Sequence, residues 1–158
     1  MQVLVEDAIL KCVKARSRKK RPRRSGCPIG FALDILGDRW TLLVIRDMVF
    51  GRKRTFSEFL ASEEGIATNI LTDRLHRLES AGLLRKETDP RSQVRVLYRL
   101  TEKGIDLVPL LVDLAVWGAK HDPETAAPKA FLKRAAEERE SLLAEITSAL
   151  RGRAERKR

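Results

Sequence analysis

Hydrophobic residues recur at the 3.6-residue spacing of helices along much of this chain. A first apolar face covers residues 29–36, and Gly37 follows it in the position where glycine commonly ends a helix. Asp38 then stands where its side chain can cap a helix over residues 40–50. The pattern predicts two consecutive helices in this part of the chain.

A capping box and an amphipathic helix come next. Thr55 can accept a hydrogen bond at the start of a short helix, and Glu58, three residues later, can reach back to the Thr55 amide. Gly65 then makes the turn to a helix over residues 68–81. The buried face of that helix carries Leu71, Leu75 and Leu78. Two short helices joined by a tight turn, the second with a polar outer face, form a helix-turn-helix.

After residue 82 the hydrophobic period changes from 3.6 to 2. Residues 83–88 and 94–100 read as two strands, and the four residues between residues 88 and 93 are typical of a turn. A hairpin behind a helix-turn-helix predicts a winged helix, with Arg91 at the wing tip facing the DNA backbone. The expected fold class is mainly α with a small β-hairpin wing, an α+β fold.

Two helical segments follow the hairpin, and each carries a row of apolar residues, here called a seam, along one side. Thr101 can cap the first, and Pro109 inside it predicts a kink or break near residues 105–106. A second seam keeps a heptad step over residues 132–149, after a linker over residues 123–128. Both seams suit helix–helix contacts, and we expect them to join two subunits. The first seam consists of Leu107, Leu110, Leu114 and Trp117.

The 158 residues carry a net charge of +10, and the excess lies at the two ends of the chain. Residues 1–24 carry +7, residues 25–123 carry no net charge and residues 124–158 carry +3. A basic run over residues 16–24 indicates an open arm behind a short helical pattern at residues 3–13. We expect a helix and basic arm over residues 1–26, a winged-helix domain over residues 27–121, and a C-terminal helical extension with a basic tail over residues 122–158.

The sequence holds no pattern typical of a catalytic or metal site. Its two cysteines and two histidines are far apart, which argues against a disulfide framework and a zinc site. No apolar run is long enough to span a membrane, and the N-terminus lacks a secretory signal. We expect a cytoplasmic, nucleoid-associated protein that is no enzyme, needs no cofactor or metal and binds no membrane.

Five motifs stand in the order and spacing of a known family: GDRWT, RTFSEF, LTDRLHRLE, GLLRK and YRLTEKG. The segment from Cys27 to about His121 resembles the HxlR-type winged helix-turn-helix transcriptional regulators, which are related to MarR-type regulators. The resemblance implies a dimeric bacterial or archaeal DNA-binding protein. It also implies a capping serine before the recognition helix, where this chain has Ala67. Thr68 can take over that cap, which would start the helix one residue later.

The candidate DNA contacts lie on and around the helix over residues 68–81. Polar residues near its N-terminus can read base edges: Asn69 can pair with adenine, Asp73 with cytosine N4, and Arg77 with guanine or a phosphate. The base-contact candidates are Thr68, Asn69, Thr72, Asp73 and Arg77, and the phosphate-contact candidates are Arg52, Lys53, Arg54, Arg74, His76 and Arg91. The alternative is a solvated face with an Asp73–Arg77 ion pair, and an Arg74 that braces Glu58 or Glu79.

Cys27 is the candidate redox sensor, because the resemblance places it where some relatives sense oxidants or electrophiles. A helix N-terminus and the basic neighbours Arg23 and Arg24 would favour its thiolate. The alternative is a buried, unreactive thiol. Trp40 and Trp117 are expected in the core.

These patterns, together with what the resemblance implies, predict a sequence-specific transcriptional regulator that acts as a homodimer on a pseudo-palindromic operator, with Cys27 as the point of modulation. Its partners would be double-stranded DNA, a second copy of the chain and an oxidant or small-molecule signal. The rival hypotheses are a non-sequence-specific architectural DNA- or RNA-binding protein and, from another class, a thiol redox enzyme.

Overall fold

The computed structural model describes residues 26–155. The expected N-terminal helix, the basic arm over residues 16–24 and the last residues of the basic tail lie outside the described residues. The chain divides into two units between Phe31 and Ala32, and each is treated by itself. Of the first unit, residues 26–31 are described, and they contain the start of helix α2 (Pro28–Leu36).

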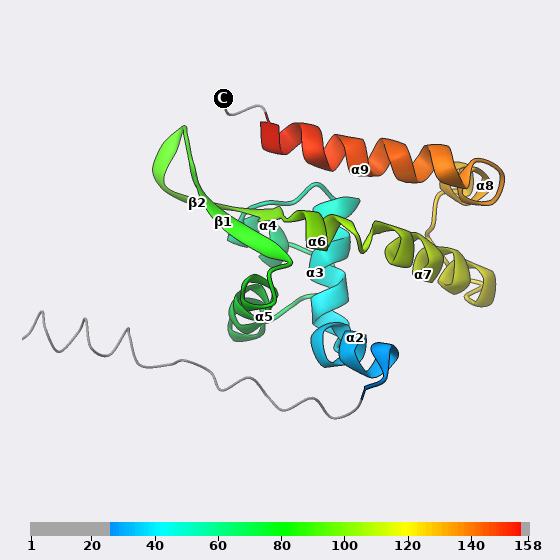
Figure 1. The fold of residues 1–158 in the computed structure, drawn as a ribbon, viewed down its shortest axis with the longest axis horizontal. Coiled ribbons are helices and arrows are strands. Elements are labelled where there is room, and N and C mark those ends of the chain that lie inside the picture. Colours follow the sequence, from blue (N-terminus) through cyan, green and yellow to red (C-terminus); the bar gives the residue numbers. More distant parts are fainter. Residues whose placement is uncertain (1–25, 156–158) are drawn as a thin grey trace, which may run out of the picture. The chain divides into compact units, whose positions relative to one another are not determined.

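Helix α3 (Arg39–Val49) runs through the middle of the second unit (Figure 1). Its N-cap is the predicted one: Asp38 Oδ1 accepts hydrogen bonds from the amides of Trp40 at 2.8 Å and Thr41 at 3.3 Å. The amphipathic pattern of the helix directs several apolar side chains inward. Those buried from α3 are Val44, Ile45, Met48 and Val49.

Helices α4 (Phe56–Leu60) and α5 (Thr68–Ser80) form the predicted helix-turn-helix. The capping box of Thr55 and Glu58 is present in both directions. The expectation that Thr68 caps α5 is wrong, because Ala67 holds the extended backbone of the N-cap and Thr68 is already the first helical residue. The recognition helix therefore starts without a side-chain cap.

The wing is an antiparallel hairpin of β1 (Leu84–Asp89) and β2 (Ser92–Leu100) that projects from the helices (Figure 1). The two strands pair regularly from Leu84 opposite Leu100 to Thr88 opposite Val96. The next pair joins Asp89 to Ser92, so residues 93–95 have no partner in the ladder and form a bulge. The hairpin was predicted from the sequence, but this bulge was not.

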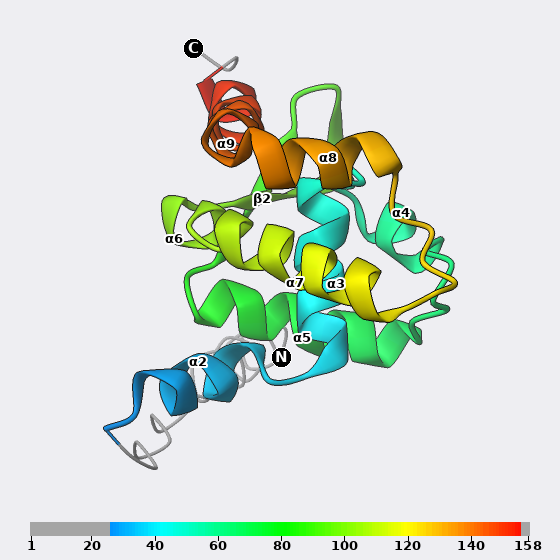
Figure 2. The same ribbon diagram turned by 90° about the vertical axis from the view of Figure 1, so that its right-hand side faces the viewer.

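Helix α6 (Glu102–Ile105) and helix α7 (Val108–His121) are separated where the proline predicted a break. Pro109 lies in the first turn of α7, where its missing N–H leaves no helical hydrogen bond unmade. Val108, Leu111 and Val112 turn toward the core. The break allows α7 to pack beside α3 (Figure 2).

The C-terminal extension forms two helices, α8 (Lys129–Glu137) and α9 (Arg139–Glu155), over the end of α3 (Figures 1 and 2). The expected heptad seam over residues 132–149 is broken at Glu138, which has a non-helical backbone. Ala135 and Leu142 are buried in the core of their own chain, and the ring of Phe131 meets Phe50 edge-on at 5.7 Å. Part of the predicted seam therefore packs inside its own chain, and its role between subunits stays a prediction.

The second unit has one continuous hydrophobic core, which extends from α3, α4 and α5 through the base of the wing to α7 and α9. Trp40 packs partly against this core, as expected. Trp117 does not, because 66% of it is exposed. Within residues 26–155, none of the helices combines the length and the apolar composition that a membrane crossing requires.

Candidate nucleic-acid interface

One face of α5 gathers the predicted base-contact residues. The leucines at helical spacing face the core, so the polar positions between them face outward. Asp73 is half-buried on this face, and the other members are exposed: Thr68, Asn69, Thr72, His76 and Arg77. The structure therefore brings together five base-contact candidates and one phosphate-contact candidate on one surface.

The predicted ion pair between Asp73 and Arg77 is present, with 2.7 Å between Asp73 Oδ2 and Arg77 Nε. Arg74 lies on the side of α5 that faces α3, where its Nε is 2.5 Å from Asp38 Oδ2. With 15% of its side chain exposed, Arg74 forms an ion pair between two helices, which leaves little of its side chain available for the predicted phosphate contact.

Arg74 also braces a different acid from the two expected from the sequence. Glu58 accepts from the amides of Arg54 and Thr55, at 2.7 and 2.8 Å. Glu79 pairs with Lys86 on the wing at 2.6 Å. Sequence spacing alone did not identify Asp38 as the partner, because Asp38 lies 36 positions away and meets Arg74 only after folding.

Only one of the three basic residues before α4 is exposed. Arg52 is exposed and has the left-handed backbone, φ 57°, that non-glycine residues adopt uncommonly. Lys53 points to a buried acid, with its Nζ 2.9 Å from Asp47 Oδ2. Arg54 is half-buried, and its carbonyl accepts from the Tyr98 amide at 2.7 Å.

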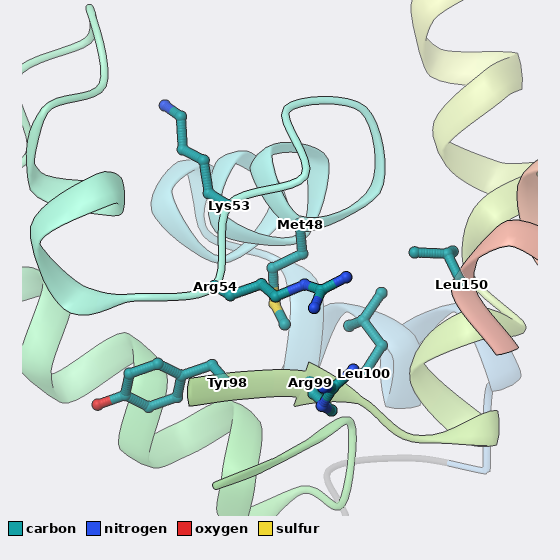
Figure 3. A pocket seen from close by; sticks show the side chains of 7 residues that line it. All are labelled: Met48, Lys53, Arg54, Tyr98, Arg99, Leu100 and Leu150. Atoms are coloured by element: carbon teal, nitrogen blue, oxygen red, sulfur yellow. The ribbon is translucent and has the colours of Figure 1, made fainter. Parts of the chain in front are cut away.

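Arg54 and Lys53 line a hollow of about 360 Å³, counting its open mouth, between the C-terminal half of α3, β2 and α9 (Figure 3). The Arg54 side chain extends toward Leu150 of α9 in this view, and Arg99 on β2 pairs with Glu87 at 2.5 Å. The lining consists of Met48, Lys53, Arg54, Tyr98, Arg99, Leu100 and Leu150. The hollow therefore lies where the C-terminal extension meets the base of the wing.

A polar cluster, not predicted from the sequence, holds the helix-turn-helix on α3. Asp47 is buried, and its Oδ2 accepts from Lys53 at 2.9 Å and from the hydroxyl of Ser62. Burial raises the pKa of Asp47, but the hydrogen bonds from Ser62, Arg46 and Lys53 outweigh it and leave the pKa below its usual value. An acid within an otherwise apolar helix face was the sequence signal for this cluster.

Arg46 extends this cluster to the turn between α4 and α5. Its Nε donates to Asp47 at 2.9 Å and its Nη2 donates to Glu64 at 2.9 Å. The hydrogen bond from Arg46 lowers the pKa of Glu64 to about 2. The turn that precedes the recognition helix is therefore tied to α3 by charge-assisted hydrogen bonds.

The wing presents basic side chains on both sides of its tip. Arg91 is exposed, and its amide donates to Asp89 at 2.9 Å. Arg95, in the bulge, was not among the predicted contacts, and its Nη1 lies 3.7 Å from Asp89 Oδ2. Val94 beside it is 92% exposed. Arg91 and Arg95 can both reach a phosphate backbone.

The outer side of α7 carries the predicted apolar seam. Leu110, Leu114 and Trp117 are exposed, and the Trp117 ring lies 4.9 Å from the ring of His121. Leu107 packs partly against the chain's own core, since it stands at the break before α7. Three of the four predicted seam residues therefore form an exposed apolar strip, and Leu107 does not belong to it.

Cys27 lies one residue before the first turn of α2. Its sulfur accepts a hydrogen bond from the Gly30 amide at 3.4 Å, and the residue is exposed. The alternative of a buried cysteine is wrong. Among the described residues, no group of three or more His, Cys, Asp and Glu side chains could hold a metal ion.

Comparison with known proteins places this geometry among transcriptional regulators. The uncharacterized HTH-type transcriptional regulator YybR of Bacillus subtilis (strain 168) is 36% identical over 104 residues, which are 65% of this chain and 82% of YybR. The crystal structure of PA1607 superposes with a TM-score of 0.60 at 36% identity and covers 67% of this chain and 74% of PA1607.

A structure of the redox regulator HypR in its oxidized form superposes with a TM-score of 0.55 at 30% identity. The match covers 61% of this chain and 98% of HypR. The family described as HxlR-like helix-turn-helix matches residues 35–126, from the end of α2 to the linker before α8. With its winged helix and its exposed recognition face, the chain belongs to the HxlR-like helix-turn-helix family of DNA-binding transcriptional regulators.

Proposed function

We propose that this regulator binds a pseudo-palindromic operator as a homodimer, with one recognition helix in each half-site. The proposal rests on one observation: the same unit exposes both the polar face of α5 and the apolar strip of α7. A dimer repeats the recognition helix by two-fold symmetry, and a palindrome repeats the half-site in the same way.

Within each half-site, base edges are read from the exposed face of α5, chiefly by Asn69 and Thr72 near its N-terminus. The phosphates are held by exposed basic side chains around this face: Arg52, His76, Arg91 and Arg95. We leave Arg74 out of this set because of its bond to Asp38. We also leave out Lys53, which is tied to Asp47 and Ser62.

The subunit contact is formed by the strip of Leu110, Leu114 and Trp117. These side chains expose apolar surface on a helix whose other side is already buried, and large exposed apolar patches mark interaction sites. A second copy of the same chain covers the strip best, because an isologous contact lets α7 pack on its symmetry mate.

Oxidation of Cys27 is the signal that we propose for this regulator. The residue is exposed at a helix start, where the Gly30 amide donates to its sulfur. A similar protein of known structure is a redox regulator by its title. A disulfide with Cys27 of a second subunit or with Cys12 would pull on α2 and change the spacing of the two recognition helices.

A binding titration separates this proposal from its rivals. Full-length protein is titrated onto the upstream region of its own gene and onto scrambled DNA of the same composition, with and without diamide. We expect tighter binding to the upstream region, a change on oxidation that reductant reverses, and no oxidant response in Cys27→Ser. Equal affinity for both DNAs would favour the non-specific architectural binder. An identical oxidant response of wild type and Cys27→Ser would show that Cys27 is not the sensor.

A further inference from the structure

Four charged side chains form a continuous chain of ion pairs from the corner before α3 to the outer face of α5. Arg74 Nε lies 2.5 Å from Asp38 Oδ2, and Arg74 Nη1 donates to Asp73 Oδ2 at 2.7 Å. The same Asp73 oxygen lies 2.7 Å from Arg77 Nε. This ion-pair chain, Asp38–Arg74–Asp73–Arg77, ends on the surface that faces DNA in the proposed function.

The inner end of the ion-pair chain is anchored. Asp38 caps α3 through its Oδ1, and its Oδ2 also accepts from the Thr41 hydroxyl at 3.2 Å. The carboxylate cannot rotate away without uncapping the helix, which costs about 1 kcal/mol. The charge of a fixed partner therefore attracts Arg74, whose Nε makes no hydrogen bond within the described residues, and Arg74 Nη1 in turn donates to Asp73 Oδ2.

The outer end is free to meet a ligand. Arg77 is half-exposed, at 49% of its side chain, and its Nε lies against Asp73 in an ion pair. In the part of the chain that the structure describes, its two terminal nitrogens, Nη1 and Nη2, have no partner. A guanidinium whose Nε side lies against a carboxylate presents these two terminal NH₂ groups side by side, the arrangement that matches the O6 and N7 acceptors of guanine in the major groove.

The ion-pair chain also decides where along the helix this fork lies. Asp73 stands one turn nearer the N-terminus of α5 than Arg77, so the pair draws the guanidinium toward Asn69 and Thr72. The N-terminal half of a recognition helix is the part that contacts base edges. Without Asp73, a long arginine side chain would sample the phosphates on either side.

We propose that Arg77 reads a guanine in each operator half-site, and that Asp73, Arg74 and Asp38 are positioning residues that hold Arg77 for this contact. In this proposal Asp73 orients Arg77 and does not read a cytosine itself, because Arg74 and Arg77 both contact its Oδ2 and offset its negative charge. The inference rests on the proposed function, since it requires a sequence-specific operator.

The test begins with selection of bound sequences from random duplex DNA by the full-length protein. Each guanine of the selected half-site is then replaced in turn by 7-deazaguanine, which lacks the N7 acceptor. We expect one position at which this replacement weakens wild-type binding about 5- to 20-fold. Arg77→Ala should lose that penalty, and should bind the unmodified operator about 10- to 100-fold more weakly.

The positioning role has its own readout. Asp73→Asn should lose most of the 7-deazaguanine penalty while its affinity for random DNA stays the same or rises, because a negative charge is removed. Asp73→Glu keeps an acid one turn before Arg77 and should restore most of the penalty. In the Arg77→Ala background, Asp73→Asn should cost no further discrimination.

Arg139→Ala serves as the matched control, because Arg139 is a paired arginine on α9 and its Nη1 lies 2.9 Å from Asp113. Its DNA binding should equal that of the wild type, and circular dichroism should show every variant folded. A 7-deazaguanine penalty that persists in Arg77→Ala would overturn this inference and leave the proposed function standing. The inference would also be overturned if Asp73→Asn, added to Arg77→Ala, removed as much further discrimination as it removes from the wild type. Failure of the wild type to select any sequence would overturn the proposed function, and this inference with it.

Discussion

Asp38, Thr55 and Thr101 each cap a helix with a side-chain oxygen, whereas Ala67 at the start of the recognition helix has no such atom. Its backbone already has the extended conformation of an N-cap, with φ −71° and ψ 145°. The first amides of α5 are therefore without a side-chain acceptor, although the position is geometrically ready for one.

Ala67→Ser should accordingly stabilise the protein. A serine hydroxyl at this position can accept from an amide of the first turn, and the expected gain in the free energy of unfolding is about 1 kcal/mol. Urea denaturation followed by circular dichroism measures it. Ala136→Ser, at an exposed position in the last turn of α8, is the control and should lose about 0.5 kcal/mol or less. Equal effects of the two serines would contradict the capping argument.

The hydrogen bond between Arg46 and Glu64 should make the free energy of unfolding depend on pH in the acid range. Glu64 has a pKa of about 2 in the fold against an ordinary value of 4.5, so its ionised form stabilises the native state above about pH 4.5. That contribution is lost as the pH falls toward 2. Glu64→Gln should cost about 1 kcal/mol at pH 7, and its difference from the wild type should shrink as the pH falls from 5 to 3.

The exposed neighbour Glu63 provides the matched control for this pH dependence. Glu63→Gln should leave the free energy of unfolding within about 0.5 kcal/mol of the wild type at every pH. A Glu64→Gln deficit that stays constant from pH 7 to pH 3 would show that the loss comes from packing and not from the carboxylate.

Among the elements, the recognition helix and the wing differ in what they can contribute to DNA binding. Helix α5 presents short polar side chains at the spacing of one helix face, and the wing presents Arg91 and Arg95 on a narrow hairpin. Contacts to base edges discriminate between sequences, whereas contacts to phosphates add affinity for any DNA. The two elements should therefore respond differently to substitution.

Asn69→Ala should weaken operator binding by roughly 1 to 3 kcal/mol and leave binding to random DNA unchanged, since an amide pairs with a specific base. Arg91→Ala should weaken both by the same factor, because it removes a phosphate contact. Fluorescence anisotropy with operator and random duplexes at one salt concentration compares them. If both variants lose operator and random binding equally, the helix over residues 68–80 is not the base-reading element.

The C-terminal extension acts as part of the fold and not as a separate arm. Arg151 pairs with Glu102 at 2.9 Å, Arg139 with Asp113, and Leu150 reaches the hollow beside Arg54. Helices α8 and α9 thus contact α3, α6 and α7, although the family match ends at residue 126. Arg151, the first residue of the predicted basic tail, therefore pairs with an acid of its own chain.

At the level of the whole molecule, the strip of Leu110, Leu114 and Trp117 is the contact that we propose for the dimer. Leu114→Asp should convert the proposed dimer to a monomer, because a charge in the centre of an apolar contact is left desolvated and unpaired. Light scattering at micromolar protein should report about twice the 17.9 kDa chain mass for the wild type and one chain mass for the variant. The expected rise in the dimer dissociation constant is about 30-fold or more.

Leu114 is exposed, so the variant should remain folded, and its circular dichroism should match that of the wild type. Ser148→Asp, at an exposed site on α9, is the control and should leave the dimer intact. A wild-type mass of one chain would contradict the proposed contact directly.

The sequence by itself determined the features that depend on near neighbours. The caps at Asp38, Thr55 and Thr101, the turn at Gly65 with φ 65°, and the break before Pro109 all follow from interactions within a few residues. The order of helices and strands, and so the winged helix, could be predicted from hydrophobic period and turn chemistry.

Only the tertiary structure decided which polar residues remain available to DNA and which apolar residues remain available to a partner. Arg74 and Lys53 look like surface cations in the sequence, but Asp38 and Asp47 draw them toward α3. Trp117 looks like a core residue, yet the core of its own chain is filled from other faces. Such outcomes depend on pairs far apart in sequence, whose positions are set by packing and not by local preference.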